Sequence, residues 1–493
     1  MKRYFPLMLA AVMTISSLCA CTGRPQGGEP TAAPTQIVSN ETAGPCVTEG
    51  PHPTLDPERQ VFDPETDYDN RYGAIIDGAM IETEDAYYLY REKYLMYYDK
   101  AMEESGYLCP KPECVHGEKQ DNISCNAYVN IAPGSLVYRE GQLWWVGDTD
   151  FRHFAIFRMN LDGTGRERVH EFEYTGDTRG LVRFYLHRDH LFYVRSDQVV
   201  KNGEAFDTAT FGCFDLDDYE KHVLAVRRSY LNPQPSIYFV GDSAYFFVSY
   251  DGITDENTDI PSEDYEYEAW LEWRLQIRKK DEILRWDPTM DEPETVYFND
   301  EDGMGWGYYS CYAAEDGKLY FEDFEKVEPD QPDGAESWNY YISTVGADGK
   351  KERAISLVDE NGVNYYPVVI SAGVVFAANA VYERGRIQEL NIWIIRLDGK
   401  TVYKGELPTA YREKYTNIAR HGLSEFSNCW VTENELLIRF TEWYDSIGPN
   451  GSDMGYYVFV KYEITPDGLI EIPLLYCRSH FASGDESIPD FGE

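Results

Sequence analysis

Four side chains that can bind a metal ion lie close together in the sequence, between positions 109 and 125. They are Cys109, Cys114, His116 and Cys125. Thiolate and imidazole are donors that tetrahedral Zn²⁺ prefers, and four protein ligands of this kind are typical of a structural zinc site. The spacing of the four residues matches no standard zinc finger. The pattern therefore predicts a metal site, but it does not identify a known type of zinc-binding motif.

Two other interpretations of this segment remain open. Two of the three thiols can form a disulfide, with the third pairing with Cys46, because thiols tend to oxidise outside the cytoplasm. Alternatively, the thiols are free and buried. With a metal or a disulfide, the loop that Pro110 and Pro112 stiffen would be cross-linked. Four further cysteines stand alone among aromatic residues and are predicted to lie in the core: Cys213, Cys311, Cys429 and Cys477.

Motifs of known catalytic sites are missing from the sequence. It contains no Gly-x-Ser-x-Gly elbow, no His-Glu-x-x-His, no phosphate-binding loop, no dinucleotide fingerprint and no sialidase-type Asp box. A pair of carboxylates is enough for glycosidase chemistry, however, and the chain has 86 acidic residues. Isolated histidines in strands or links are usually structural, which is the expectation for His187, His190 and His421.

The elements that must position these residues are short strands that recur at a blade-like period. One aromatic or β-branched strand phrase occurs seven times, roughly every 50 to 75 residues. Its copies begin at Tyr87, Leu143, Leu191, Tyr245, Leu319, Val374 and Leu436. A second strand follows each one and is clearest in residues 156–163 and 394–399, where it runs into an Asp-Gly turn. Asp-Gly suits a tight hairpin because both residues tolerate positive φ.

This repeat predicts an all-β fold, a β-propeller most consistent with seven four-stranded blades. The residues 213–217 lack the closing Gly, which leaves six or eight blades possible. A pair of β-sandwiches is the alternative architecture, but it requires no fixed long period. Aromatic residues make up 15% of the chain, and Tyr alone numbers 40, as radially packed sheets require.

The N-terminus predicts the location of the protein. Lys2 and Arg3 precede a largely apolar stretch that ends at Leu18-Cys19-Ala20-Cys21. This pattern resembles a bacterial lipoprotein signal, in which cleavage before Cys21 exposes a thiol for lipidation; a secretory peptide cut elsewhere is the alternative. We therefore expect the mature protein on the extracytoplasmic face of a membrane, held by acyl chains.

The predicted organisation is a signal peptide (1–20), a lipidated flexible tether (21–53), a propeller domain (54–475) and an acidic tail (476–493). The tether is rich in Pro, Gly, Thr and Ala and cannot bury enough surface to fold. The net charge of −42 repels phosphate backbones and anionic headgroups. Nucleic acid is thus excluded as a partner, and membrane contact is expected through the lipid alone. We expect a monomer.

The lipoprotein signal, residues 156–163 and the segment from Cys109 to Cys125 together resemble the propeller lipoproteins of Gram-positive gut anaerobes, related to TolB-like and DUF5050-type propellers. The resemblance covers nearly the whole mature chain. That family is largely uncharacterised, so the resemblance implies architecture and location but no chemistry.

Long loops on one face of the predicted propeller are the best candidates for binding. They are residues 251–281, 322–337, 377–389 and 441–455, with the links 299–306 and 409–428. Loops held by a rigid scaffold concentrate binding residues, and exposed aromatic rings or Arg suit sugars and peptides. The candidates are Trp270, Trp306, Tyr382, Arg384, Arg386, Trp443 and Tyr444. Residues 265–277 alternate as a half-buried strand does, so Trp273 is expected to pack internally.

Two functions of different classes fit these features. The first is a noncatalytic binding or scaffold module for a glycan, peptide or envelope protein. The second is an extracellular polysaccharide hydrolase or lyase that uses carboxylates on the long-loop face. No cofactor is certain, although structural zinc is possible at the four Cys and His residues.

Overall fold

The structure is a computed structural model, and it describes 328 residues in 20 stretches. These are residues 61–72, 80–91, 93–114, 116, 122, 124–150, 153–173, 181–201, 204–229, 233–252, 268–269, 273, 279–299, 311–314, 317–327, 337–346, 349–383, 386–414, 422–447 and 453–478. Residues 47–324 and 340–493 form one compact unit, which holds almost all of the described chain. Residues 1–46 and 325–339 form the other, of which only 325–327 and 337–339 are described.

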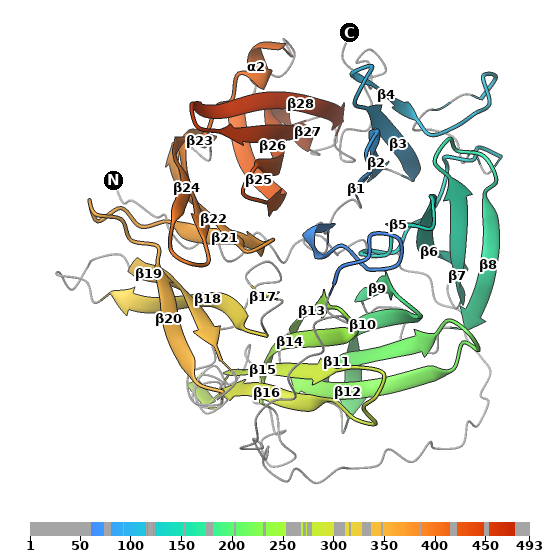
Figure 1. The fold of residues 1–493 in the computed structure, drawn as a ribbon, viewed down its shortest axis with the longest axis horizontal. Helices are drawn as coiled ribbons and strands as arrows, with labels where there is room; N and C mark the ends of the chain where they lie inside the picture. The colour runs from blue at the N-terminus through green and yellow to red at the C-terminus, as the bar shows by residue number, and fades with distance from the viewer. Residues whose placement is uncertain are drawn as a thin grey trace. The chain divides into compact units, whose positions relative to one another are not determined.

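Seven antiparallel sheets of four strands form the β-propeller (Figure 1). Blade 1 comprises β1 (Met80–Glu82), β2 (Ala86–Arg91), β3 (Tyr94–Asp99) and β4 (Glu104–Tyr107). Blade 2 comprises β5 (Val137–Arg139), β6 (Gln142–Asp150), β7 (His153–Asn160) and β8 (Glu167–Glu173). Blade 3 comprises β9 (Leu181–His187), β10 (His190–Lys201), β11 (Glu204–Asp215) and β12 (Lys221–Ser229). Blade 4 comprises β13 (Gln234–Val240), β14 (Ser243–Asp251), β15 (Lys279–Trp286) and β16 (Glu294–Asn299).

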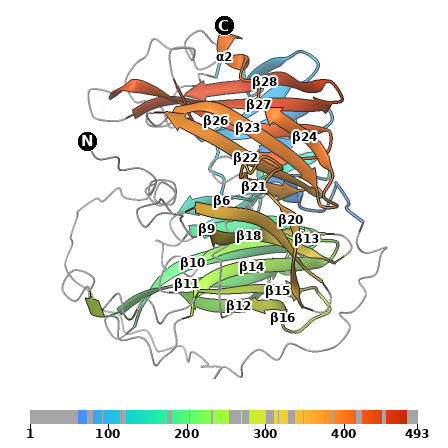
Figure 2. The ribbon, with the colours of Figure 1, turned by 90° about the vertical axis from the view of Figure 1, so that its left-hand side faces the viewer.

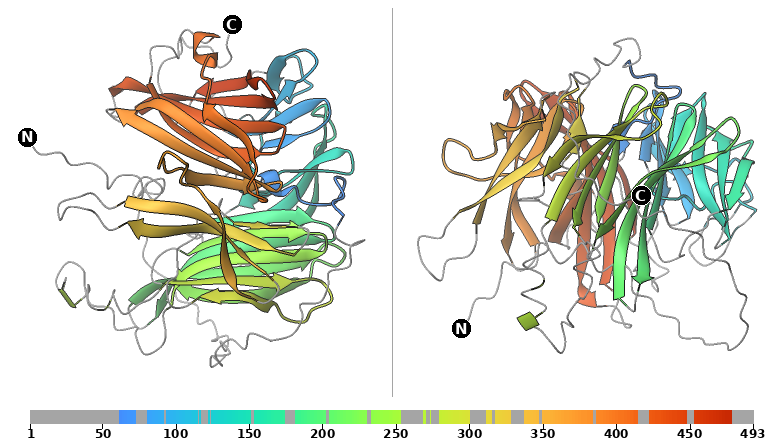
Figure 3. Two further views of the ribbon diagram at one scale, coloured as in Figure 1. Left: turned by 60° about the vertical axis from the view of Figure 1, so that its left-hand side comes forward. Right: turned by 90° about the horizontal axis from the view of Figure 1, so that it is seen from below.

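Blades 5 to 7 follow the same plan. Blade 5 comprises β17 (Cys311–Ala313), β18 (Leu319–Val327), β19 (Ser337–Val345) and β20 (Lys351–Ser356). Blade 6 comprises β21 (Tyr366–Ser371), β22 (Val374–Glu383), β23 (Arg386–Arg396) and β24 (Thr401–Glu406). Blade 7 comprises β25 (Gly422–Val431), β26 (Glu435–Ile447), β27 (Asp453–Thr465) and β28 (Gly468–Arg478). Two short helical elements lie outside the sheets in the described part of the chain, η3 (Asn70–Tyr72) and α2 (Tyr411–Lys414). Figures 2 and 3 show the sheets from the side.

The prediction of seven blades is confirmed, and each strand phrase found in the sequence is the second strand of a blade. The phrases beginning at Tyr87 and Leu143 lie in β2 and β6, and the other five lie in β10, β14, β18, β22 and β26. These strands hold many of the most buried side chains, including Leu143, Phe246 and Leu437 at 0% exposure. The phrase therefore recurs because the second strand packs against neighbouring strands in every blade.

The turns after the third strands explain the recurring Asp-Gly. Gly163 and Gly399 have φ of +80° and +84°, in the left-handed region that Gly adopts without strain. Blade 3 lacks this Gly, and Tyr219 takes a φ of 61° in its turn instead. The missing Gly is thus accommodated within a complete blade and does not change the blade number.

Two local expectations are modified. Glu268, Ala269 and Trp273 are helical, so the strand predicted over 265–277 is wrong at these residues. Trp273 is nevertheless buried, as expected for internal packing. Strand β28 extends to Arg478, so its last residues fall within the segment predicted as an acidic tail. Among the described residues, no helix has the length and apolar character needed to cross a bilayer.

Candidate metal centre

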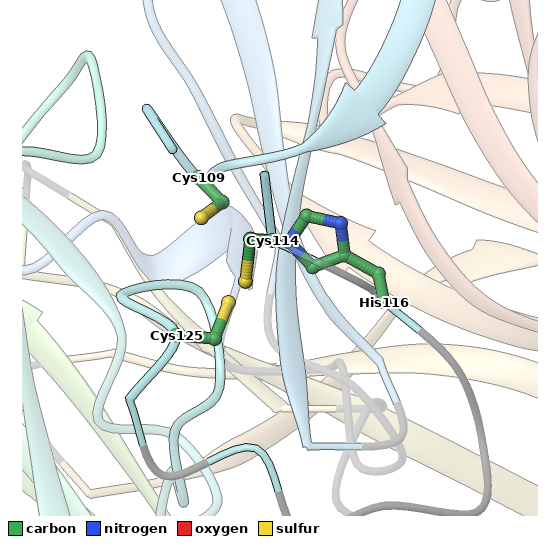
Figure 4. Close-up of side chains that lie close together, drawn as sticks. All are labelled: Cys109, Cys114, His116 and Cys125. Carbon is green, nitrogen blue, oxygen red and sulfur yellow. The ribbon is translucent and has the colours of Figure 1, made fainter. Parts of the chain in front are cut away.

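The donor atoms of Cys109, Cys114, His116 and Cys125 lie within 4.8 Å of one another (Figure 4). Zn–S distances of about 2.3 Å and Zn–N distances of about 2.0 Å place tetrahedral ligand atoms at comparable separations. The three cysteines are free, with no disulfide between them. The structure therefore brings together all four residues that the sequence predicted, and the Cys/His cluster could bind a metal ion.

Short turns of the link between blades 1 and 2 position the three thiols. Cys109 follows β4, whose register is extended by a hydrogen bond from Leu108 N to Leu95 O of 2.9 Å. Cys114 N–H donates to Lys111 O, and Cys125 N–H donates to Asn122 O, which closes one turn before each thiol. The thiols thus converge because the backbone folds back on itself twice within one link.

Aromatic packing orients the fourth ligand. The His116 ring stacks on Tyr107, with centroids 4.5 Å apart, and meets the edge of Tyr94 at 6.0 Å. Its Nε2 atom is buried and has no hydrogen-bond partner. A buried imidazole nitrogen without a partner is costly unless something binds it, and a metal ion would satisfy it.

Burial also affects the protonation of the cluster. Burial, together with hydrogen bonds to its neighbouring thiols, raises the pKa of Cys125 to about 12. Burial alone would raise the pKa of Cys109 too, but a backbone N–H at Lys111 and hydrogen bonds from the other thiols lower it overall. Burial lowers the pKa of His116, which favours the neutral imidazole that metals require.

Residues of blade 2 form hydrogen bonds with the link that carries the cluster. Arg166 Nη1 donates to the carbonyl oxygens of Cys125 (3.2 Å) and Tyr128 (2.6 Å). Asn126 Nδ2 donates to Gly163 O at 2.8 Å. Within the link, Asn122 Nδ2 lies 3.3 Å from Cys114 Sγ and can donate to it. The link that carries the cluster is therefore hydrogen-bonded to blade 2 through these side chains and to blade 1 through the backbone of Leu95 and Ala127.

The other described cysteines have a different environment. Cys213 in β11 and Cys311 in β17 are buried, and burial raises the pKa of both, to about 12 for Cys213. They lie apart in different blades, as predicted for core residues. The side chains of Cys429 and Cys477 lie outside the described part, as do Cys21 and Cys46.

The predicted long-loop binding residues are only partly within the described chain. Tyr382 in β22 has a 42% exposed side chain. Arg386 begins β23, and Trp443 and Tyr444 lie in β26, but the structure does not describe these three side chains. Trp270, Trp306 and Arg384 lie outside the described residues. The grouping of these residues into one binding surface therefore stays a prediction.

Sequence reasoning missed one set of residues, in the segment before the first blade. Residues 61–72 make hydrogen bonds to several blades, and His187 takes part in them. The segment has no apolar periodicity and was expected to belong to the propeller domain without a role of its own. The alternation of acidic residues with Tyr68 and Tyr72 was its only signal. His187 is buried and hydrogen-bonded, as a structural histidine should be.

No family model and no curated protein matches this chain. Several solved structures are similar at low identity. Dipeptidyl peptidase 4 of Porphyromonas gingivalis is 12% identical, with a TM-score of 0.35, over 80% of this chain and 49% of the peptidase. The chain thus spans about half of that protein. YjhT is 11% identical, with a TM-score of 0.34, over 70% of this chain and 97% of its own.

An α-L-arabinanase of Penicillium chrysogenum, complexed with arabinobiose, is 9% identical with a TM-score of 0.32. The match covers 61% of this chain and 84% of the arabinanase. Similarity at this level gives no argument about activity. The propeller assignment rests on the strand pairing of the seven sheets, and membership of the lipoprotein family suggested by the sequence stays a prediction.

Proposed function

We propose that the protein is a noncatalytic β-propeller module, lipid-anchored through Cys21 on the extracytoplasmic face, which binds a glycan, peptide or envelope protein and holds one structural Zn²⁺. The observation that carries the zinc part of the proposal is the convergence of four protein donors in the Cys/His cluster. Catalytic zinc sites use three protein ligands and leave a position for water, whereas four Cys and His ligands close the site. The ion would therefore stabilise the link between blades 1 and 2.

The zinc proposal is tested by metal content. The mature chain is purified under reducing, oxygen-free conditions, loaded with Zn²⁺ and dialysed, and zinc is measured by inductively coupled plasma mass spectrometry. We expect one zinc per chain in the wild type and almost none in Cys114→Ala, because a lost thiolate lowers the affinity by more than about 100-fold. Bound zinc should also raise the melting temperature, and a chelator should reverse the rise.

Cys213→Ala is the matched control, because it removes a buried thiol from a blade core. It should lower stability but leave the zinc content unchanged. A wild-type chain that binds no zinc when fully reduced would contradict the proposal. Loss of two free thiols on air oxidation, with no zinc bound beforehand, would instead support the disulfide interpretation.

The binding role has its own test. A thermal-shift screen of the soluble domain against glycans and peptides should find a class that raises its stability and is recovered intact. Tyr382→Ala and Trp443→Ala should weaken that binding without unfolding the protein. Recovery of a cleaved glycan would show an enzyme and overturn the noncatalytic proposal. For the anchor, Cys21→Ser should release the chain from the membrane fraction.

A further inference from the structure

Residues 61–72, which we call the strap, lie near the centre of the ring, between β1 and the first strands β5, β9 and β13 of blades 2 to 4 (blue in Figure 1). Tyr68 belongs to the buried core shared by blades 2 to 4, and Tyr72 to the core shared by blades 7, 1 and 2. Both tyrosines are less than 10% exposed. A segment of this kind connects parts of the ring that lie far apart in the sequence.

One end of the strap is held by blades 3 and 4. Asp67 accepts two hydrogen bonds from Arg188, at 2.7 and 3.0 Å. The Tyr68 N–H donates to His187 Nδ1 at 3.0 Å. Asn70 pairs with the backbone of Phe239, donating to its O at 2.7 Å and accepting from its N–H at 2.9 Å. The side-chain amide of Asn70 thus satisfies both backbone polar groups of Phe239 in β13.

The other end lies at the seam between the first and the last blade. Arg71 Nη1 is 3.8 Å from Glu82 of β1 and 3.9 Å from Glu435 of β26. Its guanidinium also lies 5.1 Å above the ring of Trp430 in β25. Tyr72 Oη accepts a hydrogen bond from Glu82 N at 3.0 Å. The shortest ion pair of Arg71 is to Asp69 within the strap, at 2.7 Å, and the same guanidinium also lies between the carboxylates of Glu82 in blade 1 and Glu435 in blade 7.

The topology explains why such a bridge is needed. Each of the seven sheets is built from four consecutive strands, so within the described chain no sheet combines strands from both ends. Side-chain packing alone would then hold blade 7 against blade 1. A ring closed without shared strands can open at that seam, and a segment that binds both sides opposes the opening.

We infer that the centre of the ring is a peptide-binding surface whose ligand is this chain's own strap, and that the strap closes the ring at the seam between blades 7 and 1. The strap contacts the turns between first and second strands, at Glu140 and Arg188. In an antiparallel blade, the connections between second and third strands leave from the opposite end. A partner would therefore reach the ring from the end that carries Tyr382.

The test cuts the chain between the strap and β1. A protease site replaces part of residues 73–79 in the full mature protein, which is cleaved while folded and then passed through size exclusion. We expect the strap to stay bound after cleavage, and the double variant Asn70→Ala/Arg71→Met to release it. Hydrogen exchange in β2 and β26 of the uncleaved variant should be faster by about tenfold or more, because seam opening becomes easier.

Arg158→Met is the matched control. Arg158 also pairs with a carboxylate, Glu167, and lies 5.4 Å from the ring of Trp144, but all three residues belong to blade 2. It should retain the cleaved strap and leave exchange in β2 and β26 unchanged. The inference would be overturned if cleavage alone released the strap from the protein that carries no further substitution, and hydrogen exchange in β2 and β26 did not change. Exchange that rises equally in all blades of the double variant would also overturn it, since the strap would then act on overall stability alone.

Discussion

The Cys/His cluster and the strap both hold blades together without adding a strand, but they do so with opposite chemistry. The cluster gathers three thiols and an imidazole whose buried Nε2 has no protein partner. The strap pairs Asp67, Tyr68, Asn70 and Arg71 with groups of the blades. The Cys/His cluster leaves a buried donor atom that a metal ion could bind, whereas the contacts of the strap are made within the chain.

This difference determines what each contact responds to. Metal supply and thiol oxidation should control the link between blades 1 and 2. Ionic conditions, acid and the loss of buried aromatic area should control the strap. A variant that weakens the strap should therefore leave the zinc content intact, and removal of zinc should leave the strap bound. The predictions below test this independence.

The largest effect is expected at Tyr68. Its ring is 2% exposed and packs against Tyr185 at 5.2 Å and Phe239 at 5.7 Å. Tyr68→Ala should lower the free energy of unfolding by about 3–5 kcal/mol, as truncation of a buried aromatic side chain usually does. Urea denaturation measures the change.

Tyr382→Ala is the control for this prediction, because its side chain is 42% exposed. It should change stability by less than about 0.5 kcal/mol. Zinc content should be equal in both variants and the wild type. A Tyr68→Ala chain as stable as the Tyr382→Ala chain would mean that the strap is bound too loosely to contribute.

The contrast also explains how much of the molecule the sequence could predict. The blade repeat could be predicted because the second strand of every blade is buried and therefore has a similar sequence. The Cys/His cluster could be predicted because its four residues are close together in the sequence. The contacts of the strap could not be predicted, since Asn70 and Phe239 are 169 residues apart in the sequence and no motif links them. In the same way, Tyr219 takes the positive φ in place of the expected Gly in blade 3, and its ring stacks on His170 of blade 2, a contact that the sequence does not reveal.

Acid should weaken the strap through His187. Its Nδ1 accepts the Tyr68 N–H, so Nε2 carries the proton and donates to Gly241 O at 2.7 Å. Burial lowers the pKa of His187 from 6.5 to about 4. The neutral ring therefore contributes stability that is complete above pH 6.5 and is lost as the pH falls to about 4. The shift corresponds to about 3 kcal/mol.

Unfolding free energies measured from pH 7.5 to 4 test this prediction. Asp67, Arg188 and Asp242 face the imidazole and are present in all variants compared. His187→Gln, which cannot titrate, should show a shallower loss over this range, whereas His222→Gln at an exposed position of β12 should match the wild type. Identical slopes for all three chains would exclude His187 as the source of the acid sensitivity.

The smallest effect is expected when Gly163 and Gly399, which lie in equivalent turns of blades 2 and 6, are each replaced by Ala. Gly163 and Gly399 share the positive φ and the same turn hydrogen bond of 2.9 Å, to Asn160 O and Arg396 O. A Cβ at Gly399 meets nothing within 4 Å, while one at Gly163 would lie 2.6 Å from Leu108 O, next to Cys109. Gly399→Ala should therefore cost about 1–2 kcal/mol for its backbone alone.

Gly163→Ala should cost more, because a backbone carbonyl cannot move away as a flexible side chain can. The displaced carbonyl belongs to the residue before Cys109, one of the four proposed zinc ligands, so this variant should also bind zinc more weakly than Gly399→Ala when zinc is titrated against a competing chelator. The extra destabilisation should shrink in the zinc-free protein, where Cys109 is free to shift with Leu108. Equal zinc affinities in the two variants would show that the Cys/His cluster is insulated from blade 2, and that the contacts of Arg166 and Asn126 do not position it.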